Sequence, residues 1–140
     1  MLVQKFFRLA SRLPGSVAQR AISFSAVNFA KRTGITYVQN YDEFKEICTD
    51  NEATVIADFF ASWCKPCMEL GRRFDLIMEK YEDKVCLAKV DVDKVDELMS
   101  EYEIQATPTV IALKDGKEVG RFTGLKEIEV LEKFIKEHMN

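Results

Sequence analysis

The sequence predicts a single α/β domain in which one mixed β-sheet lies between helices that cover both of its faces. Three observations carry this prediction. The first is composition: 140 residues, of which 47% are hydrophobic and 31% charged, are typical of one globular domain with a buried core. The second is an alternation of strand-like and helix-like segments. The third is a two-residue hairpin turn near the C-terminus.

Apolar runs and helical periods alternate from Gly34 onward. Short apolar runs predict strands at residues 35–39, 54–60 and 84–92. Apolar residues that recur every three or four positions predict helices at residues 41–48, 65–81, 95–102 and 126–138. Because strands that alternate with helices usually pair in parallel, we expect parallel pairing among the first three strands.

The segment 109–124 predicts two further strands that are joined at Asp115-Gly116. An Asp-Gly pair between apolar runs favours a two-residue hairpin turn, since both residues tolerate the positive φ angles of such a turn. The hairpin adds an antiparallel edge, so the expected sheet has five strands and is flanked by four helices.

Each predicted helix has an apolar face. The residues expected on these faces are Phe44, Ile47 and Cys48 in the first helix, Met68, Phe74, Ile77, Met78 and Tyr81 in the second, and Ile128, Leu131, Phe134 and Ile135 in the last. We interpret Cys48, and Cys86 in a predicted buried strand, as small core hydrophobes rather than redox partners.

Charge divides the chain into a basic leader and an acidic domain. Residues 1–41 contain six Lys or Arg and no acid, which leaves 14 bases and all 23 acids, a net charge of −9, for the remainder. A domain this acidic is not expected to bind nucleic acid. Four cysteines in a chain that can form a core favour a reducing compartment over a disulfide scaffold.

The leader has the composition of a mitochondrial transit peptide, with arginines, serines and no acids. Wound as a helix, its first 13 residues would place the basic side chains opposite the leucines. No apolar run is long enough for a secretory signal or a membrane span. We therefore expect a transit peptide at residues 1–33 and the folded domain at 34–140. A tail that touches a membrane surface is the alternative for the leader.

Two of the four cysteines, Cys64 and Cys67, stand two residues apart at the start of the predicted helix 65–81. Free backbone N–H groups and the helix dipole favour a thiolate there, so Cys64 is the expected nucleophile. Cys67 lies one turn deeper on the same face and is the expected resolving thiol. Pro66 fits the first helical turn, where its missing N–H costs nothing.

Metal binding and a purely structural disulfide are the alternatives for this pair. Zinc needs further ligands, and the chain offers only isolated Cys48, isolated Cys86 and a single histidine, His138. A disulfide across four residues removes little loop entropy from the unfolded chain. An electron-passing dithiol is therefore the favoured interpretation.

Asp58 is a lone carboxylic acid inside the apolar strand 54–60. Because an unpaired buried charge is costly, we expect its pKa to be raised, which leaves the group partly protonated near neutral pH. If the strand ends beneath the helix N-terminus, Asp58 can exchange a proton with Cys67 through water. An aspartate that faces solvent or bonds only to backbone is the alternative.

Together these motifs resemble the thioredoxin family. The resemblance rests on DFFASWCKPC (58–67) and AKVDVDKVDELMSEYEIQATPTVIALKDGKEVGRFTG (88–124), and it covers about residues 34–140. It implies the thioredoxin fold, with a central mixed five-stranded sheet flanked by four helices in a single domain. It also implies a protein-disulfide oxidoreductase that reduces disulfides in other proteins by dithiol–disulfide exchange.

The resemblance assigns roles around the cysteine pair. It implies that Cys64 attacks, that Cys67 resolves, that Asp58 is the buried acid or base, and that Lys89 is the partner of that acid. It also implies that the Thr107-Pro108 peptide bond is cis. An X-Pro bond can be cis at modest cost, and a proline is tolerated at the start of a strand. The residues expected to bind substrate are Trp63, Lys65, Pro66, Thr107, Pro108 and Gly124. For Trp63, an ordinary half-buried aromatic is the alternative.

The resemblance also implies partners. No cofactor and no metal are bound, and electrons come from NADPH through a thioredoxin reductase. Substrates are disulfide-bearing proteins such as a peroxiredoxin, the protein is a monomer, and neither nucleic acid nor membrane is a partner. With its leader the chain resembles the mitochondrial members of the family, which implies the mitochondrial matrix.

Two positions depart from the family pattern. Arg72 stands where the family usually has a proline that kinks the long helix, so a straighter helix is expected. Lys65 stands where glycine is usual. Its ammonium should stabilise the thiolate of Cys64 and make the protein a somewhat weaker reductant.

Two other functions stay open at this point. One is a disulfide oxidase or isomerase on the same fold, and the other is a module that binds partners in one redox state without catalysis. Strong oxidants of this fold usually carry a histidine between the two cysteines, whereas Pro66 stands beside Cys67 here.

Overall fold

The computed structural model describes residues 32–139. Within them the strands are β1 (Gly34–Tyr37), β2 (Thr54–Phe60), β3 (Val85–Asp91), β4 (Thr109–Lys114) and β5 (Lys117–Thr123). The helices are α1 (Tyr41–Thr49), α2 (Lys65–Tyr81), α3 (Glu97–Glu101) and α4 (Ile128–His138). The predicted transit peptide lies outside this part of the chain except for residues 32 and 33.

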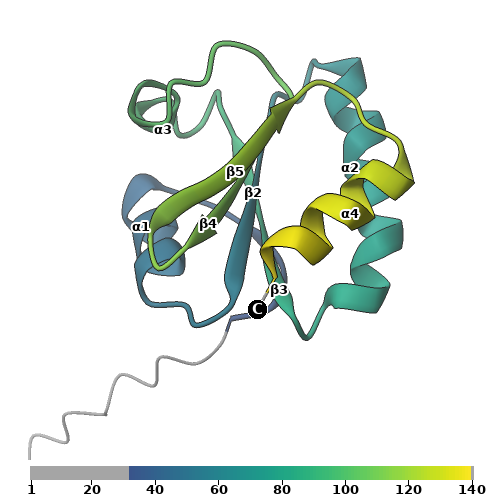
Figure 1. Ribbon diagram of the computed structural model, residues 1–140. Helices are drawn as coiled ribbons and strands as arrows, with labels where there is room; N and C mark the ends of the chain where they lie inside the picture. Colours follow the sequence, from purple (N-terminus) through teal and green to yellow (C-terminus); the bar gives the residue numbers. More distant parts are fainter. Residues whose placement is uncertain (1–31, 140) are drawn as a thin grey trace, which may run out of the picture.

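The five strands form one sheet in the order β1-β3-β2-β4-β5. β1 and β2 each pair in parallel with β3, whereas β4 is antiparallel to β2 and β5 is antiparallel to β4. Figure 1 shows α1 and α3 on one side of the sheet and α2 and α4 on the other. The prediction of a mixed sheet between two helical layers is confirmed.

The hairpin between β4 and β5 turns at the predicted dipeptide. Asp115 and Gly116 have φ angles of 51° and 73°, both in the left-handed region. This is the backbone of a type I′ turn, whose twist matches that of the flanking strands. A register shift between Ala112 and Leu113 marks an irregularity farther along the hairpin.

Two apolar clusters hold the helices to the sheet, one on each face. Phe44 of α1 and Leu98 of α3 belong to the first, and Phe74 of α2 and Leu131 of α4 belong to the second. The central strands β2 and β3 are buried on both faces, as their continuous apolar runs predict. No helix in residues 32–139 is both long enough and apolar enough to cross a membrane.

The buried face of α2 differs from the prediction in its first turns. Met68, which was expected to be buried, is 49% exposed, whereas Leu70 is fully buried. The face is set by buried Cys67, from which buried positions recur every three or four residues, and Met68 lies one residue, about 100°, away from it. The other predicted members, Phe74, Ile77, Met78 and Tyr81, are buried.

The predicted faces of the outer helices are confirmed. Phe44, Ile47 and Cys48 are buried in α1, and Leu131 and Ile135 are buried in α4. The two remaining members of the α4 face, Ile128 and Phe134, are partly buried and pack against the α2-side cluster.

We expect truncation of Phe74 to test how strongly α2 is anchored to the sheet. Phe74→Ala removes a fully buried ring and should lower the free energy of unfolding by about 3–5 kcal/mol in urea titrations. Leu76 lies on the same helix and is 61% exposed, so Leu76→Ala is the matched control. It should change the free energy of unfolding by about 0.5 kcal/mol at most. Equal effects of the two substitutions would contradict this packing.

Candidate redox site

Cys64 and Cys67 form a disulfide at the N-terminus of α2, with their Cα atoms 5.3 Å apart. Cys64 is the N-cap residue, and its Sγ accepts a hydrogen bond from the backbone N–H of Cys67 at 3.3 Å. Pro66 stands in the first helical turn. The predicted place of the pair at a helix N-terminus is confirmed, and there the helix N–H groups would stabilise a thiolate once the disulfide is reduced.

Both cysteine residues are buried, but their surroundings differ. Cys64 is 6% exposed and Cys67 is 3% exposed. Around Cys64 the side chains of Trp63, Lys65 and Pro66 are exposed, and Trp63 reaches 73%. A partner protein would therefore meet Cys64 from this surface, whereas Cys67 faces the interior beneath it.

The structure brings the other predicted docking residues to the same place. The Thr107-Pro108 peptide bond is cis, and the carbonyl oxygen of Thr107 lies 3.7 Å from Cys64 Sγ. The N–H of Gly124 donates to the carbonyl of Pro108 at 2.8 Å, and its φ angle of 88° suits glycine. The cis-proline segment thus borders the disulfide, and Gly124 is bonded to that segment.

Sequence reasoning missed Asp93 as part of this surface. The indole Nε1 of Trp63 donates a hydrogen bond to Asp93 Oδ2 at 3.0 Å. This bond holds the exposed ring beside the cysteine pair. It joins residues that are 30 positions apart, and no local pattern indicates such a pairing.

Asp58 lies in β2 on the face that α2 covers, and it is 1% exposed. One of its carboxyl oxygens, Oδ1, has no hydrogen-bond partner among residues 32–139. Burial raises the pKa of Asp58 to about 7, while the charge of Lys89 lowers it and that of Asp75 raises it. The expected buried acid with a raised pKa is confirmed, and the alternative of a solvent-facing aspartate is wrong.

Lys89 stands beside Asp58 in the sheet but bonds elsewhere. The two are paired residues of β2 and β3, and Lys89 is 7% exposed. Its ammonium Nζ lies 3.1 Å from Oδ1 of Asp75 on α2. Lys89 therefore acts on Asp58 through its charge, while its direct ion pair is with an acid that the sequence analysis did not single out.

A cleft of about 210 Å³ connects these groups with the deeper cysteine. Its lining residues are Tyr37, Asp58, Phe60, Cys67, Met68, Gly71, Arg72, Asp75 and Lys89. Cys67 and the buried carboxyl group thus share one cavity. It has room for water molecules that could carry a proton between them.

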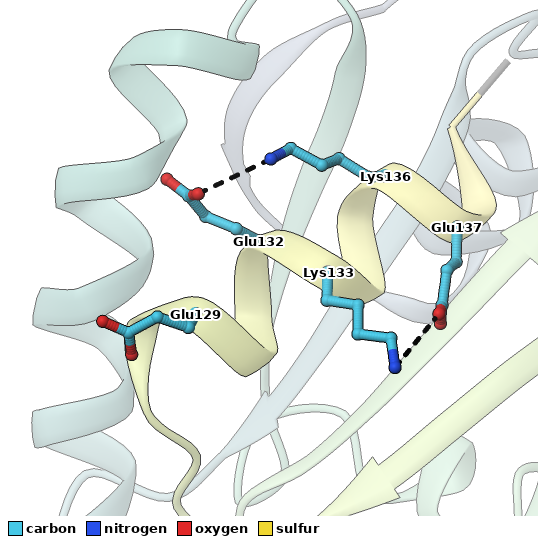
Figure 2. A pocket seen from close by; sticks show the side chains of 5 residues that line it. All are labelled: Glu129, Glu132, Lys133, Lys136 and Glu137. Carbon is cyan, nitrogen blue, oxygen red and sulfur yellow. Dashed lines mark ion pairs between the residues drawn. The ribbon is translucent and has the colours of Figure 1, made fainter.

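A second hollow, of about 450 Å³, lies on the outer surface of α4 (Figure 2). Its charged side chains pair with one another, Lys136 with Glu132 at 3.8 Å and Lys133 with Glu137 at 3.6 Å. The lining includes none of the predicted site residues and no nucleophile, which is typical of a solvated helix face.

The remaining cysteines belong to the core. Cys48 and Cys86 are free thiols with exposed fractions of 2% and 0%. Burial raises the pKa of Cys48 to about 12 and also raises that of Cys86. Such thiols are poor nucleophiles at neutral pH. Within residues 32–139, no three His, Cys, Asp or Glu side chains come together as a metal site.

A mixed five-stranded sheet that carries a CxxC disulfide at a helix N-terminus, opposite a cis-proline, defines the class of proteins with an exchangeable dithiol. Comparison with known proteins names the family within this class. The family model described as thioredoxin matches residues 35–137. The chain belongs to the thioredoxin family.

Individual relatives agree with this assignment. The mitochondrial thioredoxin of Bos taurus is 41% identical over 99 residues, which cover 71% of this chain and 60% of the relative. A mutant thioredoxin from Halobacterium salinarum NRC-1 has a TM-score of 0.70 at 32% identity, covering 79% of this chain and 96% of that one. Oxidised mitochondrial thioredoxin 3 of Saccharomyces cerevisiae has a TM-score of 0.66 at 34% identity, covering 74% and 94%. The predicted thioredoxin fold is confirmed.

The raised pKa of Asp58 predicts how stability depends on pH. Between about pH 4 and pH 7 the folded protein keeps a proton that an unfolded aspartate has lost, so the free energy of unfolding falls as pH rises through this window. Each pKa unit corresponds to about 1.4 kcal/mol, so ionisation of the buried Asp58 lowers the free energy of unfolding by about 4 kcal/mol at most above pH 7.

We therefore expect Asp58→Asn to stabilise the oxidised protein by up to about 4 kcal/mol at pH 8 and to lose this advantage near pH 4. Urea unfolding at several pH values measures it. Asp83→Asn, at an exposed acid, is the control for removing one charge and should show no such pH dependence. A variant no more stable than the wild type at pH 8 would contradict the burial of an ionisable group here.

Proposed function

We propose that this protein is a protein-disulfide reductase that acts by dithiol–disulfide exchange. The observation that carries the proposal is the Cys64–Cys67 disulfide, in which Cys64 caps α2 among exposed side chains while Cys67 lines a cleft that contains Asp58. The region matched in the first relatives spans 60% of their length, and they are described as mitochondrial thioredoxins.

The reduced site would work in two exchange steps. The thiolate of Cys64 attacks one sulfur of a substrate disulfide, a mixed disulfide forms, and the other substrate sulfur leaves as a thiolate. Cys67 then gives its proton to the carboxylate of Asp58, through water, and attacks Cys64 Sγ. The second substrate thiolate leaves, and both electrons have passed to the substrate. The product is the disulfide that the structure contains.

The surface around Cys64 supplies the docking site in this proposal. Thr107, Pro108 and Gly124 would receive an extended substrate segment, with Trp63 beside it. No cofactor is needed within the protein, because NADPH would return two electrons through a thioredoxin reductase. Substrates would be disulfide-bearing proteins, a peroxiredoxin among them, met by a monomer.

We place this activity in the mitochondrial matrix. The support is the acid-free, arginine-bearing leader together with relatives described as mitochondrial. In this proposal residues 1–33 direct import and residues 34–140 form the mature domain.

The order of the two cysteines gives the most direct test. In assays with NADPH, thioredoxin reductase and insulin, wild type should turn over, and Cys64→Ser should lose activity because the attacking sulfur is gone. Cys67→Ser should stop at the mixed disulfide and retain its substrate covalently through Cys64, which mass spectrometry of the linked peptides identifies.

The matched control is the double variant Cys64→Ser, Cys67→Ser, which keeps Cys48 and Cys86 and should trap nothing. Trapping by this variant would assign the chemistry to another thiol. A redox potential at or above the roughly −180 mV of disulfide isomerases would also contradict a reductase.

Lys65 gives a second test of the site's electrostatics. Its side chain is exposed at the first position of α2, and no carboxylate in the described part of the chain pairs with it. Lys65→Gly should raise the pKa of the Cys64 thiol and make the redox potential more negative, by about 30 mV at most, because solvent screens an exposed ammonium. Thiol titration and equilibration with glutathione measure the two quantities. Lys84→Gly is the control, and equal results for both variants would remove Lys65 from the redox chemistry.

A further inference from the structure

The charged end of Lys89 is bonded away from the acid beside which its backbone lies. Asp58 and Lys89 are paired residues of β2 and β3, where side chains of paired residues share one face of the sheet. The Lys89 ammonium nevertheless pairs with Asp75 at 3.1 Å, and Asp58 Oδ1 has no hydrogen-bond partner in the part of the chain that the structure describes. A buried carboxyl group thus lies next to a cation that another acid holds.

Gly71 of α2 lies beside the Lys89 ammonium in this arrangement. It stands one helical turn before Asp75, and a Cβ atom at this position would lie 3.6 Å from the Lys89 Nζ. The ammonium therefore passes directly over the backbone of α2 on its way to Asp75. A long side chain at position 71 would occupy the same space.

No other cation in the cleft takes the place of Lys89 beside Asp58. The titratable and charged groups that face the carboxyl group are Tyr37 of β1, Cys67, Arg72 and Asp75 of α2, and Lys89 of β3. Cys67 does not titrate while the disulfide is closed, and Arg72 bonds to Glu69 at 3.1 Å. The Tyr37 ring lies 5.6 Å from Nζ of Lys89, and the β4 neighbour of Asp58 is the apolar Val110.

We propose that Asp75 is a positioning residue for proton transfer: by holding the Lys89 ammonium at α2, it withholds a direct ion pair from Asp58 and so sets the proton affinity of that acid. Asp75 touches neither sulfur, so its effect passes through Lys89 and Asp58. The inference rests on the proposed function only where the acid exchanges its proton with Cys67.

The chemical consequence concerns the second exchange step. A carboxylate in direct contact with an ammonium has a pKa about 1–3 units lower than one without such a partner. An Asp58 that Lys89 paired directly would be a weaker base toward Cys67, and it would hold no proton to return near neutral pH. The Asp75–Lys89 pair keeps the acid in the range where it can do both.

Asp75→Asn is the first test, with the pKa of Asp58 read from its side-chain carboxyl 13C shift in the oxidised protein. With the disulfide closed, Cys67 cannot couple to the titration. The freed ammonium should turn to Asp58 and lower its pKa from about 7 by about one unit or more. Asp75→Glu keeps the charge and should restore the wild-type titration, whereas Asp83→Asn should not change it. An unmoved pKa in Asp75→Asn overturns the proposal.

The same substitution in a variant that lacks Lys89 distinguishes two effects of Asp75: holding the Lys89 ammonium away from Asp58, and acting on Asp58 directly through its own charge. In Lys89→Met, removal of the Asp75 charge should lower the pKa of Asp58 by only a small fraction of its effect in the wild type. The reason is that the Asp75 side chain is 56% exposed and its charge is screened. Equal shifts in the two backgrounds would show that Asp75 acts by its charge alone, which contradicts a positioning role.

Single-turnover reduction of insulin, measured as a function of pH, tests whether the pKa of Asp58 controls the rate of disulfide exchange. The midpoint of the rate profile should move to lower pH in Asp75→Asn, in the same direction as the carboxyl titration. If the titration moves and the rate profile does not, Asp75 positions Lys89 but Asp58 is not the base of the reaction. That outcome overturns the proposed proton route and leaves the positioning role intact.

Discussion

The packing of α2 on the central strands is the constraint on which the site depends. Leu70 and Phe74 are fully buried against β2 and β3, and they fix both the height and the rotation of the helix. The N-terminus of α2 then stands over the end of β2, with Cys64 at the cap and Cys67 turned inward. Because Cys64 is the N-cap and Cys67 is in the first turn, every contact that holds the helix in place also positions the two sulfurs. The cysteine pair therefore belongs to the packed core, although exposed side chains surround Cys64.

The same packing creates the polar cleft. A larger residue at position 71 of α2 would contact the Lys89 side chain, and Lys89 would lose its acidic neighbour in the sheet if Asp58 were apolar. Asp58, Lys89 and Asp75 come from two strands and one helix, and all three line the space beneath the disulfide. Asp58 and Lys89 are buried there, so the charge of Lys89 acts on Asp58 more strongly than it would at the surface, whereas solvent screens the exposed side chain of Asp75. Small displacements of α2 would thus change the chemistry of the cysteines as well as their position.

Local patterns in the sequence predicted most of the helices and strands, whereas contacts between residues far apart in the sequence could not be predicted from them. The range 65–81 was predicted with its observed bounds, because Pro66 and the apolar period both mark the helix. The first strand was extended to residue 39, but it ends at Tyr37, and Asn40 caps α1 by accepting a bond from the Glu43 N–H at 2.9 Å. Met68 was assigned to the core because the helical period alone does not say which residue begins the buried face.

The ion pair of Lys89 shows the same limit within the site. A resemblance to the family suggested Asp58 as its partner, and register in the sheet does place the two side by side. Which acid takes the ammonium depends on how far a flexible lysine reaches and on the space left by Gly71 on α2. Neither quantity is visible in a linear pattern. The Trp63–Asp93 bond likewise became visible only when the loop after β3 had been placed.

The position of Lys89 reconciles two opposing requirements on a buried acid. With no cation nearby, burial would raise the pKa of Asp58 further, and the group would keep its proton when Cys67 needs a base. With the ammonium in direct contact, the group would stay ionised and could not return a proton to Cys67 when the disulfide is reduced. A cation near enough to act through its charge, yet bonded to Asp75, gives a pKa of about 7. An acid of this strength can both accept and release a proton at neutral pH, as the proposed dithiol–disulfide exchange would require.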